Sequence, residues 1–181
     1  MLLPDNQINT DKLVLQNLTE ADAFGPYLSW FSNPKVTQYL SVDPSEVTAG
    51  ALQGFISQNN NSSIELLLGI FIVPNTHIGN IRLLDIDRDL SRCSIGMLIG
   101  EEQHWGQGFA SEAIITITNF AHSELGIKRL FAGCHGSNIG SIRSFKKAKY
   151  KTLDEVAPDL VAEDNWTGGI NIEHLMLVHI D

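Results

Sequence analysis

A glycine-rich turn between a strand-like and a helix-like segment is the feature that most constrains this chain. It reads Trp-Gly-Gln-Gly-Phe-Ala-Ser over residues 105–111, after the apolar run 93–100 and before the helical pattern 111–125. Such a turn presents a row of backbone N–H groups at the positive end of the helix dipole. Gly106 and Gly108 let an anion approach the backbone closely. The sequence therefore predicts an anion site, most often one for a phosphate.

Three phosphate-binding turns compete for this segment. The nucleotide P-loop needs a lysine after its last glycine, and none follows Gly108. The dinucleotide turn needs a third glycine, where this chain has Ser111. The acyl-CoA turn R/Q-x-x-G-x-G/A of the GNAT N-acetyltransferases is similar at its last two positions, Gly108 and Ala110. Trp105 stands in place of Arg or Gln, and an aromatic residue there resembles the branch that acetylates ribosomal-protein N-termini.

A second motif points to the same family. Asn138, Ser141, Phe145 and Tyr150 lie at the offsets of the family pattern N-x-x-A/S-x-x-x-Y/F-x-x-x-G-F. Lys149 replaces the glycine of that pattern, which predicts a strained or differently shaped turn after the helix.

The N-terminal half carries further similarity. Residues 11–22 resemble the opening strand and acidic cap of this branch, residues 28–40 its W-x-N-x-P-x-V segment, and residues 77–83 its I-G-x-I strand. The resemblance covers nearly the whole chain, which is identified as a GNAT N-acetyltransferase of the ribosomal-protein-alanine N-acetyltransferase-like (RimJ/RimL-type) branch.

The resemblance implies one α/β (α+β) domain over residues 1–181. Its sheet is expected to be mixed, mostly antiparallel, splayed at its middle strands and flanked by helices. Hydrophobic patterning and turn residues predict the individual elements. The expected strands are 13–17, 66–73, 78–86, 93–98, 129–134, 151–155 and 170–179, the expected helices 20–31, 36–40, 44–58, 111–125 and 141–148, and the expected loops 59–63 and 157–169.

Composition and net charge limit the classes of partner that this chain is expected to bind. The net charge of −9 argues against nucleic acid as the main partner. It suits a cationic amine acceptor, although many proteins carry such a charge for solubility alone. Neither a signal peptide nor a membrane span is apparent, so a cytoplasmic location is expected. Cys93 and Cys134 are expected to be reduced and packed in strands, because no metal-ligand spacing accompanies them.

By resemblance, the cosubstrate is acetyl-CoA and no metal is needed. The pantetheine arm would pair with the strand near residues 97–99, the glycine turn would hold the pyrophosphate, and Asn138 would hydrogen-bond the pantetheine. A basic helix face that includes Lys147 would lie beside the phosphates. The expected cofactor-binding residues are Met97, Leu98, Ile99, Trp105, Gly106, Gln107, Gly108, Phe109, Ala110, Ser111, Asn138, Ser141, Phe145 and Lys147.

The same resemblance implies direct attack of an amine on the thioester. A base must remove a proton from the ammonium, and the candidates are Glu101 and Glu102, with Glu163 and His104 as further alternatives. Many relatives use a tyrosine to protonate the leaving thiolate, but Phe145 holds that place and cannot donate a proton. In the ribosomal N-terminal branch that the chain resembles, the proposed donor is a serine three residues after the Asn, and Ser141 occupies that place. It could also serve only as a helix-start residue.

The acceptor stays open between a protein N-terminus and a small cationic amine. Aminoglycoside, polyamine and amino-sugar acetyltransferases share the fold, and a non-catalytic acyl-CoA-binding module or a plain interaction protein would also fit parts of the pattern. Residues 30–40 and 157–169 are expected to set acceptor specificity. A homodimer is common among relatives.

Overall fold

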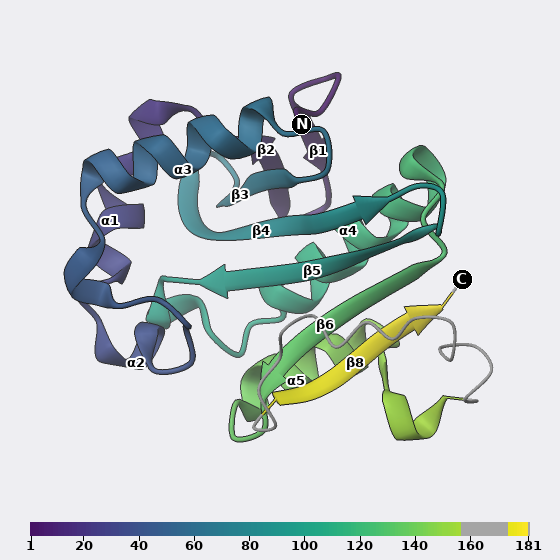
Figure 1. The fold of residues 1–181 in the computed structure, drawn as a ribbon. Helices are drawn as coiled ribbons and strands as arrows, with labels where there is room; N and C mark the ends of the chain where they lie inside the picture. Colours follow the sequence, from purple (N-terminus) through teal and green to yellow (C-terminus); the bar gives the residue numbers. More distant parts are fainter. Residues whose placement is uncertain (157–173, 181) are drawn as a thin grey trace.

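The computed structural model describes residues 1–156 and 174–180, and side chains within 1–156 and 178–180. One eight-stranded sheet has the order β1-β2-β3-β4-β5-β6-β8-β7 (Figure 1). All neighbouring strands are antiparallel except β5 and β6. The strands are β1 Gln7–Asn9, β2 Leu13–Asn17, β3 Leu66–Ile72, β4 Thr76–Asp87, β5 Arg92–Ile99, β6 Arg129–His135, β7 Lys151–Thr152 and β8 His174–Ile180. The mixed, mostly antiparallel sheet is confirmed.

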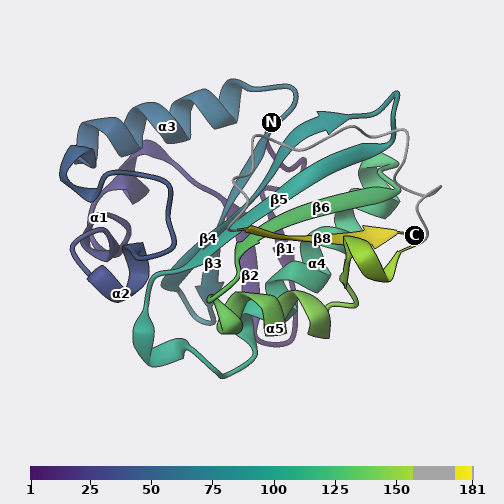
Figure 2. The ribbon, with the colours of Figure 1, turned by 60° about the horizontal axis from the view of Figure 1, so that its bottom comes forward.

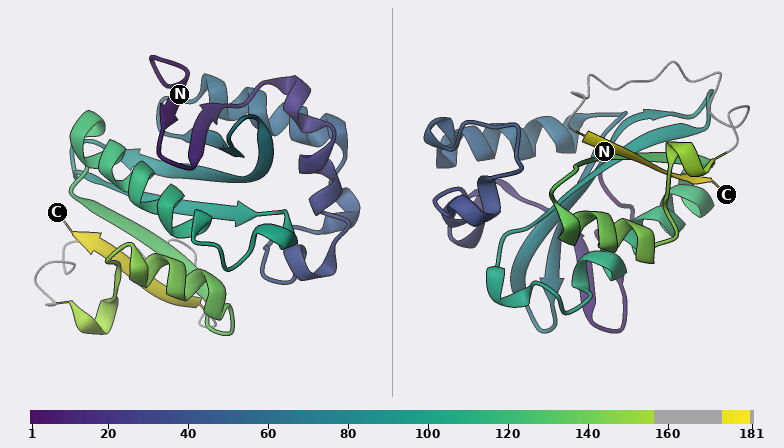
Figure 3. Two further views of the ribbon diagram at one scale, coloured as in Figure 1. Left: turned by 180° about the vertical axis from the view of Figure 1, so that it is seen from behind. Right: turned by 90° about the horizontal axis from the view of Figure 1, so that it is seen from below.

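Helices cover both faces of this sheet. α3 packs on one face, while α4 and α5 pack on the other (Figures 2 and 3). The α-helices are α1 Pro26–Trp30, α2 Pro34–Thr37, α3 Ala49–Asn61, α4 Phe109–Leu125 and α5 Ile139–Lys147.

Strand β3 separates two hydrophobic cores. Leu66, Leu68 and Ile70 belong to the core that includes the buried side of α4. Leu67 and Phe71 point to the other face and join the core beneath α1 and α3. Because side chains alternate across a strand, a strand buried on both faces shows a continuous apolar run, as β3 does.

The sheet splays between its two parallel strands. β5 and β6 are in register only at Arg92, Cys93 and Ser94. Beyond Ser94 the strands diverge, and the side chains of β5 change from buried to partly exposed toward Ile99. Figure 1 shows the resulting V, which opens toward the carboxyl end of β5. The β5 edge therefore offers unpaired backbone groups to a ligand.

Several expected boundaries in the N-terminal half are wrong. The expected helix 36–40 is α2, which ends at Thr37, and the expected helix 44–58 becomes a 3₁₀ turn at Pro44–Glu46 followed by α3. The expected helix 20–31 divides at Gly25, whose φ is +69°, into a 3₁₀ turn and α1. The expected loop 59–63 begins instead with the last turn of α3, which runs to Asn61. Asn59 and Asn61 donate side-chain hydrogen bonds to the carbonyls four residues back, and Asn60 donates to Leu18 O, so the polar run stays helical.

Other differences concern helix starts and late strands. The expected helix 111–125 begins earlier, because Gly108 caps α4 and Ser111 is buried within its first turn. The expected strand 151–155 keeps its pairing only at Lys151–Thr152 and continues as a 3₁₀ turn. Lys149 has φ +67°, which confirms the strained turn expected where the family has glycine.

Part of the expected structure lies outside the described residues, including the loop 157–169, Glu163 and the start of the strand expected at 170–179. Within the described part of the chain, no helix has the length and apolar character needed to cross a bilayer. Cys93 and Cys134 are free and buried in β5 and β6, as expected.

Candidate functional site

A cavity of about 280 Å³ lies where β5 and β6 separate. Its walls come from the end of β5, the glycine turn, the end of β6, the start of α5 and the segment that begins with α2. Among the residues expected to bind the cofactor, those that line it are Met97, Leu98, Ile99, Trp105, Gly106, Ala110, Asn138 and Ser141. Segments more than 40 residues apart in the sequence thus meet at one place.

The glycine turn ends as the N-terminus of α4. Gly106 and Gly108 have φ of +75° and +89°, a left-handed conformation that favours glycine. Gly108 is the N-cap and supplies no side chain to the first N–H groups of the helix. These N–H groups and the helix dipole fit an anion such as a pyrophosphate. Lys147 Nζ lies 3.8 Å from where a Cβ on Gly108 would stand.

Trp105 ties the turn back to the central strand. Its Nε1 donates a hydrogen bond to Ile99 O at 2.9 Å, while 40% of its surface stays exposed. This hydrogen bond therefore fixes the distance between the end of β5 and the turn.

Asn138 and Ser141 organise the start of α5. Asn138 is the N-cap, and its Oδ1 accepts a hydrogen bond from Ser141 N–H at 3.1 Å. The amide NH₂ of Asn138 is the part of this side chain that can donate to a ligand. Ser141 Oγ lies 3.2 Å from Cys134 Sγ, at the cavity wall. Burial raises the pKa of the Cys134 thiol, so the thiol stays protonated beside the serine.

The two candidate base carboxylates are held by hydrogen bonds from N-terminal side chains. Glu101 accepts a hydrogen bond from Trp30 Nε1 at 2.8 Å and lines a different depression beside His77. Glu102 accepts a hydrogen bond from Lys35 Nζ at 2.5 Å, and this contact lowers the pKa of Glu102. A carboxylate with a lowered pKa is a weaker base. Neither carboxylate is among the described residues that line the cavity between β5 and β6.

The segment that begins with α2 spans the two walls of the splay. Lys35 pairs with Glu102, which follows β5. Tyr39 OH donates to Ser137 O at 3.3 Å, and the Tyr39 ring lies 5.4 Å from the ring of His135 at the end of β6. The segment therefore contacts both diverging strands across the mouth of the cavity.

The remaining expected residues lie elsewhere. Gln107, Gly108, Ser111 and Lys147 line a neighbouring cavity on the other side of the glycine turn. Phe109 packs against the main core, with its ring 5.9 Å from that of His104. Phe145 is 2% exposed and makes an edge contact with the Tyr150 ring. Phe145 therefore packs α5 against the core and does not line the cavity.

Several lining residues were not singled out from the sequence. Cys134 and His135 end β6, and Lys35 and Tyr39 follow the break at Asn33-Pro34. The position of the first pair at the end of the strand expected at 129–134 was an available signal. The second pair lies in the segment 30–40, which was expected to set acceptor specificity, although neither residue was named individually.

Among the described residues, no group of three or more His, Cys, Asp or Glu side chains could hold a metal ion. The described polar side chains that line the cavity include no Asp or Glu; they are Lys35, Gln38, Tyr39, Cys134, His135, Asn138 and Ser141.

Comparison with known proteins agrees with this geometry. Residues 12–151 match the family model of the acetyltransferase (GNAT) domain. The uncharacterized N-acetyltransferase p20 of Bacillus licheniformis is 29% identical over 163 residues, which span 80% of this chain and 90% of that protein.

Two solved structures share the fold at lower identity. A Vibrio cholerae protein assigned as a ribosomal-protein-serine acetyltransferase has a TM-score of 0.73 and 19% identity over the full length of both chains. Spermidine N-acetyltransferase from Vibrio cholerae, solved with CoA and spermine, has a TM-score of 0.76 and 15% identity over 94% of this chain and 96% of that one.

The splayed sheet and the glycine turn at a helix start define an enzyme of the acyltransferase class. The chain belongs to the GNAT acetyltransferase family, because the family model matches well over half of its residues.

Proposed function

We propose that residues 1–181 form one acetyl-CoA-dependent N-acetyltransferase domain that transfers an acetyl group directly to a primary amine. One observation carries the proposal: the unpaired edge of β5 leads to a turn whose bare N–H groups begin α4. An extended ligand arm with an anionic end fits this arrangement. The thioester supplies an activated acyl group when it is bound.

In this proposal the chain holds the cosubstrate mainly with its backbone. The β5 backbone at Met97, Leu98 and Ile99 binds the pantetheine arm as an added strand would, because those groups lack a partner in β6. The N–H groups of residues 106–111 bind the pyrophosphate. The Asn138 amide donates to the pantetheine.

Two proton transfers need protein groups. The acceptor amine must lose a proton before it can attack, and Glu101 and Glu102 are the proposed bases. The lowered pKa of Glu102 favours Glu101 of the two. Glu101→Gln is expected to shift the rise of kcat/KM to higher pH, because amine deprotonation would then depend on solvent. An unchanged pH profile for both single variants would remove the two carboxylates from the mechanism.

Ser141 is the proposed donor to the leaving thiolate. Ser141→Ala should lower kcat by about fivefold, less than a full general acid contributes, because a CoA thiol is acidic enough for water to substitute in part. Ser144→Ala is the matched control, since that hydroxyl lies one turn further along α5 and donates to Gly140 O. Steady-state kinetics at saturating substrate would measure both. Equal kcat for Ser141→Ala and wild type would exclude the role.

The acceptor that the described cavity wall favours is a peptide N-terminus. Lys35 is the one Lys or Arg among the described lining residues, which include no Asp or Glu, and this wall offers little to a polycation. The structural neighbour assigned to ribosomal-protein serine acetylation supports the RimJ/RimL-type branch. A small cationic amine is the second candidate, favoured by the net charge of −9 and by the spermidine N-acetyltransferase neighbour.

Thiol release from acetyl-CoA tests the proposal. Peptides with Ser or Ala N-termini are compared with polyamines, aminoglycosides and amino sugars at equal concentration. Turnover with peptides alone is the expected result. Turnover only with polyamines would show that the acceptor is a small cationic amine rather than a peptide N-terminus. CoA binding without turnover on any amine would indicate a binding module, and absence of CoA binding would overturn the proposed function.

A further inference from the structure

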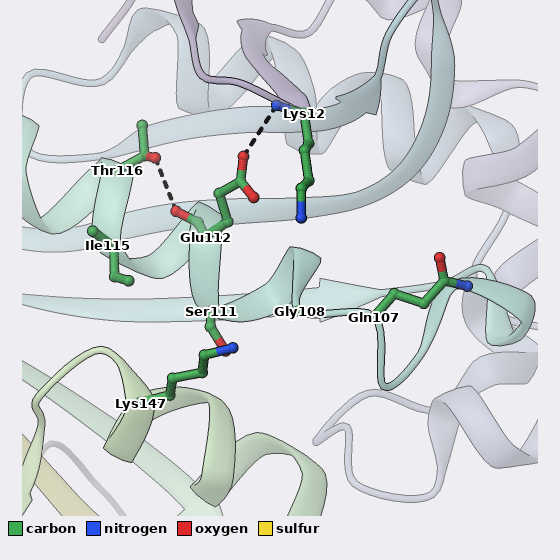
Figure 4. A pocket seen from close by; sticks show the side chains of 8 residues that line it. All are labelled: Lys12, Gln107, Gly108, Ser111, Glu112, Ile115, Thr116 and Lys147. Atoms are coloured by element: carbon green, nitrogen blue, oxygen red, sulfur yellow. Dashed lines mark hydrogen bonds between the residues drawn. The ribbon is translucent and has the colours of Figure 1, made fainter.

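A depression of about 450 Å³ lies outside the cavity between β5 and β6. Three parts of the chain contribute to it: the 3₁₀ turn Glu20–Ala23 with the start of α1, the connection from β3 to β4, and the segment that follows β5. Its described lining residues line neither the cavity between β5 and β6 nor the cavity beside the glycine turn that Figure 4 shows. The depression is therefore separate from the places where the proposed reaction holds its cosubstrate.

His77 offers an unused hydrogen-bond acceptor to this depression. Its Nε2 lies 3.0 Å from Gly79 O and 2.9 Å from Asn80 Oδ1. Because a carbonyl oxygen only accepts, Nε2 carries the proton, and Nδ1 of the neutral ring keeps its lone pair. Burial lowers the pKa of His77, which favours the neutral ring. His77 is only 8% exposed, yet it lines the depression, and its Nδ1 has no donor within the described part of the chain and is not sealed from solvent.

The aromatic neighbours of His77 fix the direction of this nitrogen. The His77 ring stacks on the Phe71 ring with 4.4 Å between centroids, and the Trp30 ring meets it edge-on at 4.9 Å. A turn of the ring would also break the contacts of Nε2. A largely buried acceptor without a donor costs free energy, because it has lost hydrogen bonds to water. A ligand that donates to Nδ1 would recover that cost.

Two carboxylates lie beside His77. Asp22 Oδ2 accepts hydrogen bonds from Thr19 N–H at 2.7 Å and Thr19 Oγ at 2.8 Å, and Glu101 Oε1 accepts from Trp30 Nε1 at 2.8 Å. The charges of Asp22 and Glu101 both act on the His77 ring, since they oppose the effect of burial on its pKa. The described lining of the depression includes no Lys or Arg, and neither carboxylate forms an ion pair with another described residue. The depression therefore attracts a cation.

The same groups indicate which kind of cation fits. Within the residues that the structure describes, no three His, Cys, Asp or Glu side chains are placed to hold a metal ion. A primary ammonium is larger and reaches its acceptors through N–H donors. Its three N–H groups match one ring nitrogen and two carboxylates. Phe24 is 52% exposed at the rim and offers an apolar surface to the alkyl chain that carries the ammonium.

We propose that this depression is a binding site for a primary alkylammonium group, held by His77 Nδ1, Asp22 and Glu101. The site is independent of the proposed function, because the cosubstrate takes no part in it. A free polyamine and a lysine side chain of a partner protein both carry this group. The proposal concerns the chemistry that they share.

Nitrogen-15 NMR of the His77 ring tests the site in the absence of acetyl-CoA. Titration with n-butylammonium should move the Nδ1 resonance upfield, as a new hydrogen-bond donor does, and should shift the backbone amides of Thr76 and Gln103, which line the depression. Tetramethylammonium carries the same charge but no N–H group, so it should bind at least about fivefold more weakly. Comparison of 1,4-diaminobutane with Nα-acetyl-lysine amide identifies the source, since the tighter ligand indicates a polyamine or a protein side chain.

Variants separate this site from general attraction to an acidic protein. Asp22→Asn and Glu101→Gln keep an acceptor oxygen for Thr19 and Trp30, and each should weaken n-butylammonium binding by about fivefold. Glu124→Gln is the control, because it removes the same charge from an exposed position at the C-terminal end of α4. Thermal unfolding checks that each variant is folded.

Three results would overturn the proposal. One is an unchanged Nδ1 resonance of His77 at saturating n-butylammonium. Another is equal affinity for tetramethylammonium, which would assign the binding to charge alone. The third is an equal loss of affinity in Glu124→Gln, because the net charge of −9 would then attract cations without a defined site. None of these results would bear on acetyl transfer, which thiol release measures separately.

Discussion

Gly100→Ala is expected to lower the free energy of unfolding by about 3 kcal/mol, at the upper end of the usual cost of overpacking. Gly100 follows β5, and its N–H donates to Ile78 O at 2.9 Å. An added Cβ would overlap Trp30 Cγ and Cδ2 and lie 2.5 Å from Cε2. These ring atoms belong to a large rigid side chain, so no small rotation relieves the overlap.

Trp30 has no room to withdraw. It is 2% exposed, and its Nε1 donates to Glu101 at 2.8 Å. Its ring also lies 4.9 Å from the His77 ring and 5.4 Å from the Tyr27 ring. The backbone of Gly100 would have to move instead, which would displace the end of β5 where the cavity begins. We therefore expect a loss of cosubstrate affinity together with the loss of stability.

Thermal unfolding measures the stability change, and a fall in Tm of roughly 6–12 °C is expected for a domain of this length. Gly54→Ala is the matched control: Gly54 is exposed inside α3 with nothing near its absent Cβ, so alanine should stabilise by about 1 kcal/mol. In a Trp30→Leu background the penalty of Gly100→Ala should shrink, because interacting sites are non-additive. An equal penalty in both backgrounds would contradict the steric explanation.

The sequence predicts those features that depend on local chemistry. The turn at residues 105–111 needs left-handed glycines and an absent cap side chain, and both are visible in the residue types. The order of strands and helices follows from hydrophobic patterning, and the splay was implied by the family resemblance. The strain at Lys149 was also expected, because a lysine stands where a left-handed residue is needed.

Prediction from the sequence is wrong where contacts with residues far away in the chain determine the local structure. Residues 59–61 are polar and indicated a loop, but Asn60 bonds Leu18 O and the helix continues. The expected helix starts at Ser111, yet Gly108 caps the helix and Ser111 is buried within its first turn. Glu102 follows the central strand as a base might, but Lys35 from α2 engages it. Each outcome depends on tertiary contacts that no local pattern encodes.

The two ends of α4 offer the sharpest test of the anion site. Gly108 caps the N-terminus with φ +89°, and Gly126 caps the C-terminus with φ +70°. Alanine at either position should cost about 1–2 kcal/mol of stability, because an L-residue is strained in the left-handed region. Gly126 has nothing within 4 Å of its absent Cβ, so this substitution should change stability only.

Gly108→Ala should in addition weaken acetyl-CoA binding by roughly thirtyfold. A shift of the turn that removes one charge-assisted N–H contact costs about 2 kcal/mol, which corresponds to that factor. The new methyl group would also stand 3.8 Å from Lys147 Nζ, on the surface that an anion must approach. Calorimetric titration of both variants with acetyl-CoA separates the two effects, because backbone strain is common to them. If Gly126→Ala lost as much affinity as Gly108→Ala, helix stability rather than direct contact would explain the loss, and the turn at residues 106–111 would not be the anion site.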